Sequence, residues 1–385
     1  MKKLLVWFMG ILIIFLPLFS AAEAKIKNWE NVAVSNLDFR WGTQSDIAYG
    51  DGRYGILFYD ARETTNVQLY LSLLKKSGEK IGNDIRITNS TADSMDPNIV
   101  WNGKDFGIFY RESWIIYYVR VSNNGQIITG PISIDIGVHP SVVWNEKTKE
   151  YGLTWWGGVE GTPEGTVFVR LDRNGNKLSP IIGLNSVVDG GYYRPRIATN
   201  GNNYGITWYG RRDCGSDGCP EVIFTVVNAN GEKIVSDRAL THSGTEGPWS
   251  IAWNGFEYAM VTQGSSGISL LRVDETGDVI SFSPLSEFLT DRHTRYLEII
   301  WDKNHYVLSF VDCLTCNTSP DANIYITKYD RYGNSLSDFI RISKSAKNDY
   351  FPSKAILAAS SVAIVWVGDY EETSQNISFA QENNF

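Results

Sequence analysis

The chain has 385 residues and a formal net charge of -8 at pH 7. Because no cluster of lysine or arginine offsets this acidity, nucleic acid and anionic membrane surfaces are excluded as main partners. The 35 glycines, the aromatic share of 13% and the lack of long helical periodicity favour β structure.

The first 24 residues have the three parts of a secretory signal. Lys2 and Lys3 precede an apolar run from 4 to 19, and Ala22-Glu23-Ala24 supplies a small-x-small cleavage pattern. An uncleaved membrane anchor is the alternative, but the apolar run is short for a spanning helix. We therefore expect cleavage after Ala24, a secreted or periplasmic protein, and no membrane insertion afterwards. Cleavage changes the formal net charge from -8 to -9.

One sequence unit recurs along the rest of the chain. An apolar strand, often opened by proline, runs into Trp-Asn-Gly, and an aromatic residue followed by glycine starts a second strand. The clear copies are 96–110, 139–155, 194–208, 247–262 and 296–310, with diverged copies at 45–59 and 351–366. In six copies an alternating strand that ends in a glycine turn follows, and the last copy stops after that strand. A period near fifty residues with about four strands per unit predicts the blades of a β-propeller.

The repeated residues have physical roles in such a unit. Asn-Gly favours a tight hairpin with positive φ at both central residues. The glycines after the aromatic residue leave room where neighbouring sheets approach; they are Gly55, Gly107, Gly152 and Gly205. Large aromatic residues recur at one position of the second strand, where packing between sheets is favoured over a sugar-binding platform. These are Phe58, Tyr110, Trp155, Trp208, Phe310 and Trp366.

The two ends of the chain predict how the last unit is completed. The seventh unit lacks a fourth strand, and residues 28–38 resemble the fourth strands of other units. We therefore predict an all-β, seven-bladed β-propeller with four-stranded antiparallel blades, whose last blade is closed by the N-terminal strand. The predicted domains are a signal peptide, 1–24, and a propeller, 25–385, with blades at about 45–90, 95–135, 139–185, 194–241, 248–290, 296–343, and 351–385 plus 28–38.

The copies resemble the tandem repeats of secreted bacterial β-propeller proteins, which have the form P-x-h-x-W-[ND]-G-x-x-Y-x-h-x-W. The resemblance covers residues 45–385. It implies a propeller and export, and it transfers no catalytic residue. The S-x-D-x-G-x-x-W boxes of sialidases are missing from the sequence, which argues against importing sialidase chemistry.

Four cysteines occur as two close pairs. In an exported protein, Cys214 with Cys219 and Cys313 with Cys316 are interpreted as two local disulfides. A four-thiolate zinc site is the alternative, but the pairs are far apart in sequence and unequally spaced. We expect no metal and no cofactor.

The candidate ligand-binding residues stand just before or at the start of each first strand. Propellers usually bind ligands at this end of the central channel, and these residues vary among otherwise similar copies. Arginine with tyrosine and tryptophan at such a mouth suits an anionic or sugar ligand; ordinary polar loop surface is the alternative. The predicted residues are Asp96, His139, Tyr193, Arg194, Trp249, Arg295, Tyr296 and Tyr350.

Enzymatic motifs are missing from the sequence. No G-x-S-x-G or H-E-x-x-H pattern occurs, and the four histidines are not spaced as metal ligands. No catalytic residue is assigned. The leading hypothesis is an exported, non-enzymatic binding propeller that recognises a glycan or a protein through its loop-bearing face. The alternatives are a glycan-active hydrolase or lyase with its site at the channel mouth, and a structural envelope component.

Overall fold

The computed structural model describes most of the chain beyond the predicted signal. The described residues are 29–37, 44–158, 164–184, 194–212, 219–241, 245–264, 267–285, 295–312, 322–343, 348–356, 361–371 and 374–382. Their regular elements are β-strands, which pair antiparallel in six sheets. Among these residues there is no helix with the length and apolar character needed to cross a bilayer. The all-β class and the antiparallel pairing are as predicted.

Four of the sheets contain four strands each, in chain order. The first comprises β2 (Ser45–Gly50), β3 (Arg53–Asp60), β4 (Gln68–Lys75) and β5 (Lys80–Arg86). Another comprises β13 (Arg196–Thr199), β14 (Asn203–Arg212), β15 (Cys219–Asn228) and β16 (Lys233–Ala239). The third comprises β17 (Thr245–Trp253), β18 (Tyr258–Gly264), β19 (Gly267–Val273) and β20 (Val279–Pro284). The fourth comprises β21 (Arg295–Trp301), β22 (Tyr306–Asp312), β23 (Asn323–Tyr329) and β24 (Ile340–Arg341).

A seven-stranded sheet holds two sequence units, because they share one strand. Its strands are β6 (Ser94–Trp101), β7 (Asp105–Glu112), β8 (Ile115–Ser122), β9 (Ile127–Asn145), β10 (Glu150–Gly157), β11 (Gly165–Leu171) and β12 (Ile182–Gly183). The first half of β9 pairs with β8 and its second half pairs with β10. The boundary predicted between 135 and 139 therefore lies inside a continuous strand.

The sixth sheet joins the two ends of the described chain. It contains β25 (Asn348–Ile356), β26 (Val362–Glu371), β27 (Ser374–Glu382) and the N-terminal strand β1 (Trp29–Leu37). β1 pairs antiparallel with β27, from Trp29 opposite Glu382 to Leu37 opposite Gln375. The pairing predicted for residues 28–38 with the last unit is confirmed.

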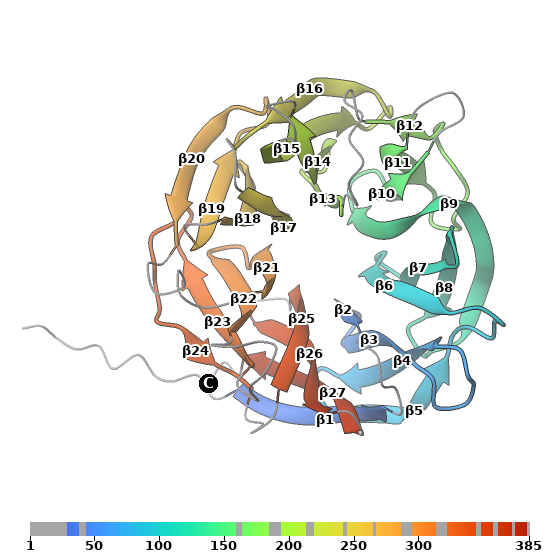
Figure 1. Cartoon of the computed structure of the whole chain (residues 1–385). Helices are drawn as coiled ribbons and strands as arrows, with labels where there is room; N and C mark the ends of the chain where they lie inside the picture. Colours follow the sequence, from blue (N-terminus) through green and yellow to red (C-terminus); the bar gives the residue numbers. More distant parts are fainter. Residues whose placement is uncertain are drawn as a thin grey trace, which may run out of the picture.

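The sheets are arranged around a common centre, with the first strand of each unit innermost (Figure 1). Each innermost strand contacts the next one along the chain. The contacting pairs are β2 with β6, β6 with β9, β9 with β13, β13 with β17, β17 with β21, β21 with β25, and β25 with β2.

The hydrophobic core lies between adjacent sheets. One cluster, for example, combines Tyr54 and Phe58 of the first unit with Val365 and Phe379 of the last. The recurring second-strand aromatic residues are at most 3% exposed, which confirms their predicted role in packing. They fill the space between sheets and do not form an exposed platform.

Glycine is required where neighbouring sheets come closest. A Cβ added to Gly205 of β14 would lie 2.5 Å from a ring carbon of Tyr258 in β18, and one added to Gly152 would lie equally close to Tyr204. Real Cβ atoms do not approach other atoms this closely. The predicted close approach at these repeat positions is confirmed.

Replacing Gly205 with alanine is expected to lower the free energy of unfolding by ~1–3 kcal/mol, because the methyl group displaces the buried Tyr258 ring. Chemical denaturation measures this change. Gly158→Ala is the matched control, since the nearest atom to its added Cβ is 3.8 Å away, in a flexible glutamate side chain. Equal losses in the two variants would contradict the packing argument.

The Trp-Asn-Gly turns differ from the expected geometry. Gly103 has a φ of +83°, but Asn102 does not have a positive φ. Instead, the Asn102 side-chain oxygen accepts backbone N–H groups of Lys104 (3.1 Å) and Asp105 (2.8 Å). Its side-chain nitrogen donates to the hydroxyl of Tyr151 in the next unit at 2.7 Å. The prediction of positive φ at both residues is wrong, because the asparagine closes the turn with its side chain and ties two units together.

Candidate binding site at the centre of the sheets

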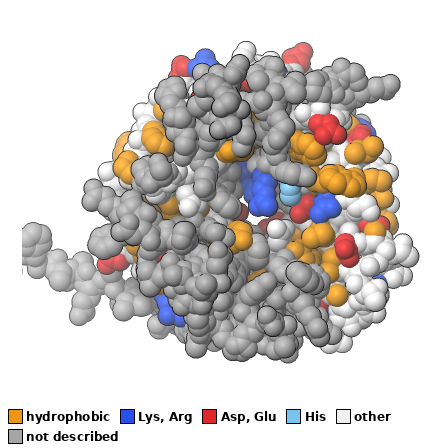
Figure 2. All heavy atoms as spheres, viewed as in Figure 1, with side chains coloured by type: hydrophobic (Ala, Val, Ile, Leu, Met, Phe, Trp, Pro, Cys, Tyr) orange, Lys and Arg blue, Asp and Glu red, His pale blue; other side chains and the backbone are white. Residues whose placement is uncertain are grey.

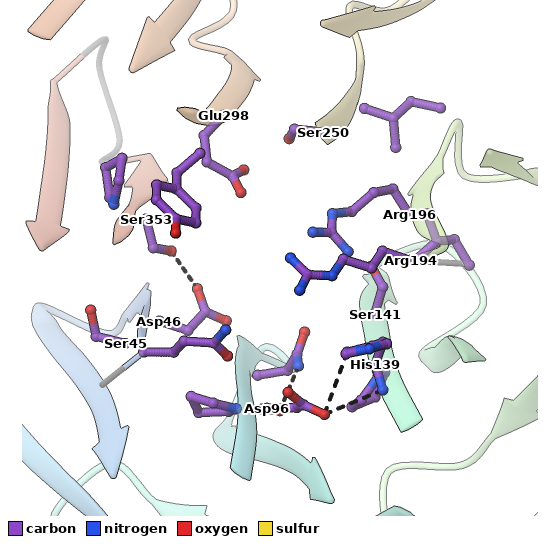
Figure 3. Close-up of a pocket in the computed structure, with 18 of the residues that line it drawn as sticks. Ser45, Asp46, Asp96, His139, Ser141, Arg194, Arg196, Ser250, Glu298 and Ser353 are labelled. Carbon is purple, nitrogen blue, oxygen red and sulfur yellow. Dashed lines mark hydrogen bonds and ion pairs between the residues drawn. The ribbon is translucent and has the colours of Figure 1, made fainter. Parts of the chain in front are cut away.

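A polar cavity lies among the seven innermost strands. Its volume is about 340 Å³, and every innermost strand contributes to its lining. Figure 2 shows the hollow on this face, with basic, acidic and histidine side chains along its wall. Figure 3 shows the side chains from different strands pointing into it. The strand arrangement thus converts seven separate sequence units into one site.

The lower wall of the cavity carries one side chain from each unit, at the same repeat position. The residue that follows each of these is a buried isoleucine in most units, so a polar position alternates with an apolar one along the strand. We call these seven side chains the inner ring; they are Asp46, Asn98, Ser141, Arg196, Ser250, Glu298 and Ser353.

Residues two positions earlier form an upper tier at the mouth. Asp96, His139 and Tyr296 have left-handed backbone conformations, with φ of 54°, 55° and 55°. At the same point the pairing of each strand with its neighbour shifts register, as at a β-bulge. Such conformations cost ~1–3 kcal/mol each and are retained where the surrounding structure holds them. The bulge places both Asp96 and Asn98, and likewise both Tyr296 and Glu298, along the cavity.

Asp96 belongs to a charge cluster that spans two units. Arg111 Nε donates to its carboxylate at 2.9 Å, the backbone N–H of His139 donates at 3.3 Å, and His139 Nδ1 lies 3.6 Å from the same oxygen. Burial acts to raise the pKa of Asp96, but His139 and Arg111 outweigh it and hold the pKa well below its usual range. Asp96 is therefore ionised and internally compensated.

Asp46 is in a different state. Its carboxylate accepts the Ser353 hydroxyl at 2.6 Å and the backbone N–H groups of Ile47 at 2.8 Å and Ile99 at 2.9 Å. These hydrogen bonds lower the pKa of Asp46, but burial has the larger effect and raises it to about 6. The nearby charge of Glu298 also raises this pKa. Asp46 thus changes its charge in the mildly acidic range.

Two arginines from one unit face these carboxyl groups. Arg194, exposed at the mouth, and Arg196, in the inner ring, extend their guanidinium groups from the β13 side into the cavity (Figure 3). Burial lowers the pKa of Arg196; Glu298 opposes this effect and the charge of Arg194 adds to it. Opposite walls of the cavity therefore carry opposite charge.

An exposed tryptophan lies near the rim. Trp114, 56% exposed, is in the turn between β7 and β8, and its carbonyl accepts the backbone N–H of Gly137 at 2.8 Å. The preceding residue, Ser113, accepts a hydrogen bond from Arg111, the partner of Asp96, at 2.7 Å. An aromatic face is therefore available beside the mouth.

The structure brings together half of the predicted site residues. Asp96, His139, Arg194 and Tyr296 line the cavity. Tyr193 lies outside the described residues, as do Cys214, Cys313 and Cys316. The backbone positions of the remaining residues are described, but their side chains, including that of Cys219, lie outside the described part; these residues are Trp249 in β17, Arg295 in β21, Tyr350 in β25 and Cys219 in β15.

The prediction missed the inner ring, although the sequence contains a signal for it. Asn98, Ser141 and Arg196 each follow the repeat proline directly and precede an apolar residue. This alternation places them on one face of the strand. The residue at this position is polar in every copy, but its type changes from copy to copy. This combination indicates the positions that line the centre.

Comparison with known proteins identifies the class of fold. No family model matches the chain, and no curated protein matches its sequence. The β-propeller domain of the Trilobed protease from Pyrococcus furiosus is similar in structure, with a TM-score of 0.55, 11% identity, and coverage of 89% of this chain and 98% of that one. Oligogalacturonate lyase from Vibrio parahaemolyticus has a TM-score of 0.51 and 13% identity, with coverage of 92% and 96%. At these identities the likeness establishes the fold alone. The protein has a β-propeller fold.

Proposed function

We propose that the protein is an exported seven-bladed β-propeller formed by residues 25–385 after removal of a signal, residues 1–24. The succession of contacts from β2 through each innermost strand and back to β2 supports seven blades in a ring. The shared strand β9 accounts for two blades in one sheet. β1 supplies the fourth strand of the last blade, which supports closure by the N-terminal segment.

We further propose that this propeller is a non-enzymatic binding module that recognises a glycan at the central cavity. The observation that carries the proposal is the inner ring, in which seven strands each place a polar side chain around one hollow. A volume of about 340 Å³ lies near the lower end of the range for small-molecule pockets, ~300–1,000 Å³. This size suits one end of a glycan chain, with Tyr296 and Trp114 available as stacking surfaces.

Binding is tested by applying the mature chain to a glycan array. The affinity for the glycan that binds best is then measured by titration calorimetry. Tyr296→Ala and Trp114→Ala are each expected to weaken binding about tenfold, because an aromatic surface at the mouth is lost. Phe256→Ala is the matched control: Phe256 is 66% exposed and lies in the β17–β18 turn, at the opposite end of its blade.

Thermal melting of each variant separates loss of binding from loss of folding. If the chain binds a protein but no glycan in these assays, the proposed ligand becomes a protein. A glycan whose affinity is unchanged in both mouth variants would place recognition elsewhere on the molecule.

A glycan-active hydrolase or lyase is the second candidate, and one observation favours it. A partly buried carboxyl group with a pKa of about 6 and a second acidic residue in the same cavity suit general acid catalysis, and Asp46 with Glu298 provides this pair. Incubation of the array's best glycan with the wild-type chain, followed by chromatography, decides between the candidates. Turnover that is lost in Asp46→Asn would overturn the non-enzymatic proposal.

A further inference from the structure

The unit containing β13 differs from the others in charge. Its first strand is entered through Arg194-Pro195-Arg196, whereas the corresponding positions of the two preceding units are Asp-Pro-Asn and His-Pro-Ser. Both arginines line the cavity. Arg196 opens β13 and Arg194 stands two residues before it, and both side chains extend into the cavity (Figure 3). One blade therefore supplies two cationic groups to the site.

Placing these two groups together has an energetic cost. Arg196 is partly buried, and the like charge of Arg194 acts together with this burial against its protonated form. Glu298, followed by Asp96 and Asp46, acts in the opposite direction, but burial still lowers the pKa of Arg196. An anion between the two guanidinium groups would relieve the repulsion, and arginine matches a carboxylate with two parallel hydrogen bonds.

The opposite wall selects among anions. Glu298 and Asp46 line it, and a carboxylate accepts hydrogen bonds but repels a second anion. Inorganic phosphate or sulfate would satisfy the arginines but would bring further negative charge toward this wall. A sugar acid has a carboxylate for the arginines and hydroxyl groups that donate to Glu298, and the smaller polar members of the inner ring contribute further partners. These are Asn98, Ser141, Ser250 and Ser353.

We propose that the Arg194–Arg196 pair binds the carboxylate of a sugar acid, so that the ligand of the cavity is an acidic glycan. This inference rests on the proposed glycan-binding function and specifies its ligand class. Arg194 receives the carboxylate at the mouth, Arg196 holds it within the inner ring, and the acidic wall binds the hydroxyl groups of the same sugar.

The test compares each glycan with its neutral counterpart. The mature chain is applied to an array that carries uronic-acid-containing and neutral glycans. The affinity for the best acidic glycan is then measured by calorimetry, before and after chemical reduction of the glycan's carboxyl group to an alcohol. Reduction is expected to weaken binding at least tenfold. Inorganic phosphate and sulfate are measured as competitors, and they are expected to compete only at far higher concentrations than the glycan.

Variants of the two arginines link the effect to the site. Arg194→Gln and Arg196→Gln are each expected to abolish the difference between the acidic and the reduced glycan, while Arg196→Lys retains part of it because the charge remains without the planar fork. Arg194 is exposed, so its variant tests the proposal even where loss of Arg196 disturbs folding. Arg238→Gln is the control, since Arg238 is an exposed arginine of β16 paired with Asp278.

The outcomes separate the two proposals. Preferred binding of neutral glycans, or unchanged affinity after carboxyl reduction, would overturn the inference and leave glycan binding intact. Phosphate or sulfate binding as tightly as the best glycan would overturn the assignment to a carboxylate. Binding to no glycan of either kind would overturn the proposed function itself.

Discussion

Affinity for the best acidic glycan is expected to fall about tenfold, ~1.4 kcal/mol, as the pH rises from 5 to 7.5. Asp46 has a pKa of about 6, so it is neutral at the start of this range and negative at its end. The ligand carboxylate is ionised throughout, because such groups titrate near pH ~4. Rising pH therefore adds a repulsive charge to the cavity. Titration calorimetry at several pH values measures the change.

The other charged groups of the cavity define the controls. The groups that line the cavity with Asp46 are Arg194 and Arg196 of the β13 unit, Glu298 and Tyr296 of β21, Asp96 of β6, which is paired with Arg111, and His139 of β9. Asp46→Asn is expected to remove most of the dependence. If this variant retains the full pH dependence of affinity, Asp46 is not the group that causes it.

The same group links pH to stability. The pKa of Asp46 is higher in the folded protein, about 6, than its ordinary value of 3.8, so the folded state binds more protons between these values. The stabilising contribution is complete below pH 3.8 and is lost as the pH rises through 6, at up to ~1.4 kcal/mol per unit. Asp46→Asn should therefore be more stable than the wild type at pH 7.5, as measured by thermal melting.

Replacing Trp29 with alanine is expected to lower the free energy of unfolding by ~3–5 kcal/mol. Trp29 of β1 is 6% exposed and packs in a cluster with Val307, Ile326 and Trp366, which belong to the last two units. The loss leaves a cavity at the seam between the ends of the chain. Chemical denaturation measures it, and Trp114→Ala is the matched control, because that tryptophan is exposed and its loss should change stability by less than ~0.5 kcal/mol.

Deletion of residues 25–40 extends this test to the whole strand. Ser35 of β1 donates to Asp84 at 2.6 Å, and Lys80 donates to the Val34 carbonyl at 2.7 Å, so β1 is also fixed to the first unit. Deletion is expected to destabilise the fold further and to expose the edge of β27 to aggregation. A melting temperature equal to that of the wild type would contradict the role of β1 in joining the ends.

The sequence predicted the sheets well because their determinants are local and repeated. A glycine at the position of Gly205 recurs in four units and an aromatic residue at the position of Trp155 recurs in six, and each has one physical role wherever it occurs. The pairing of residues 28–38 with the last unit was also predictable, since one unit lacked a strand. The shared strand β9 was not, because nothing in its composition distinguishes a strand that continues from two strands joined by a short turn.

The site was predicted less completely, for a reason of geometry. Asp96, His139, Arg194 and Tyr296 were identified from their place before the first strands. Asp46, Arg196 and Glu298 belong to different units, and only the register of each strand shows that they face the same hollow. The raised pKa of Asp46 depends on burial by its neighbours in space, which no sequence pattern expresses.

The continuous strand β9 also determines where this chain tolerates rearrangement. Most adjacent units are joined by a connecting segment, which is the usual place for an insertion, a protease cut or new termini in a circular permutant. The second and third units have no such segment, because the strand that ends one begins the other. We therefore expect a split version of this protein to fold best when these two units are kept on one fragment.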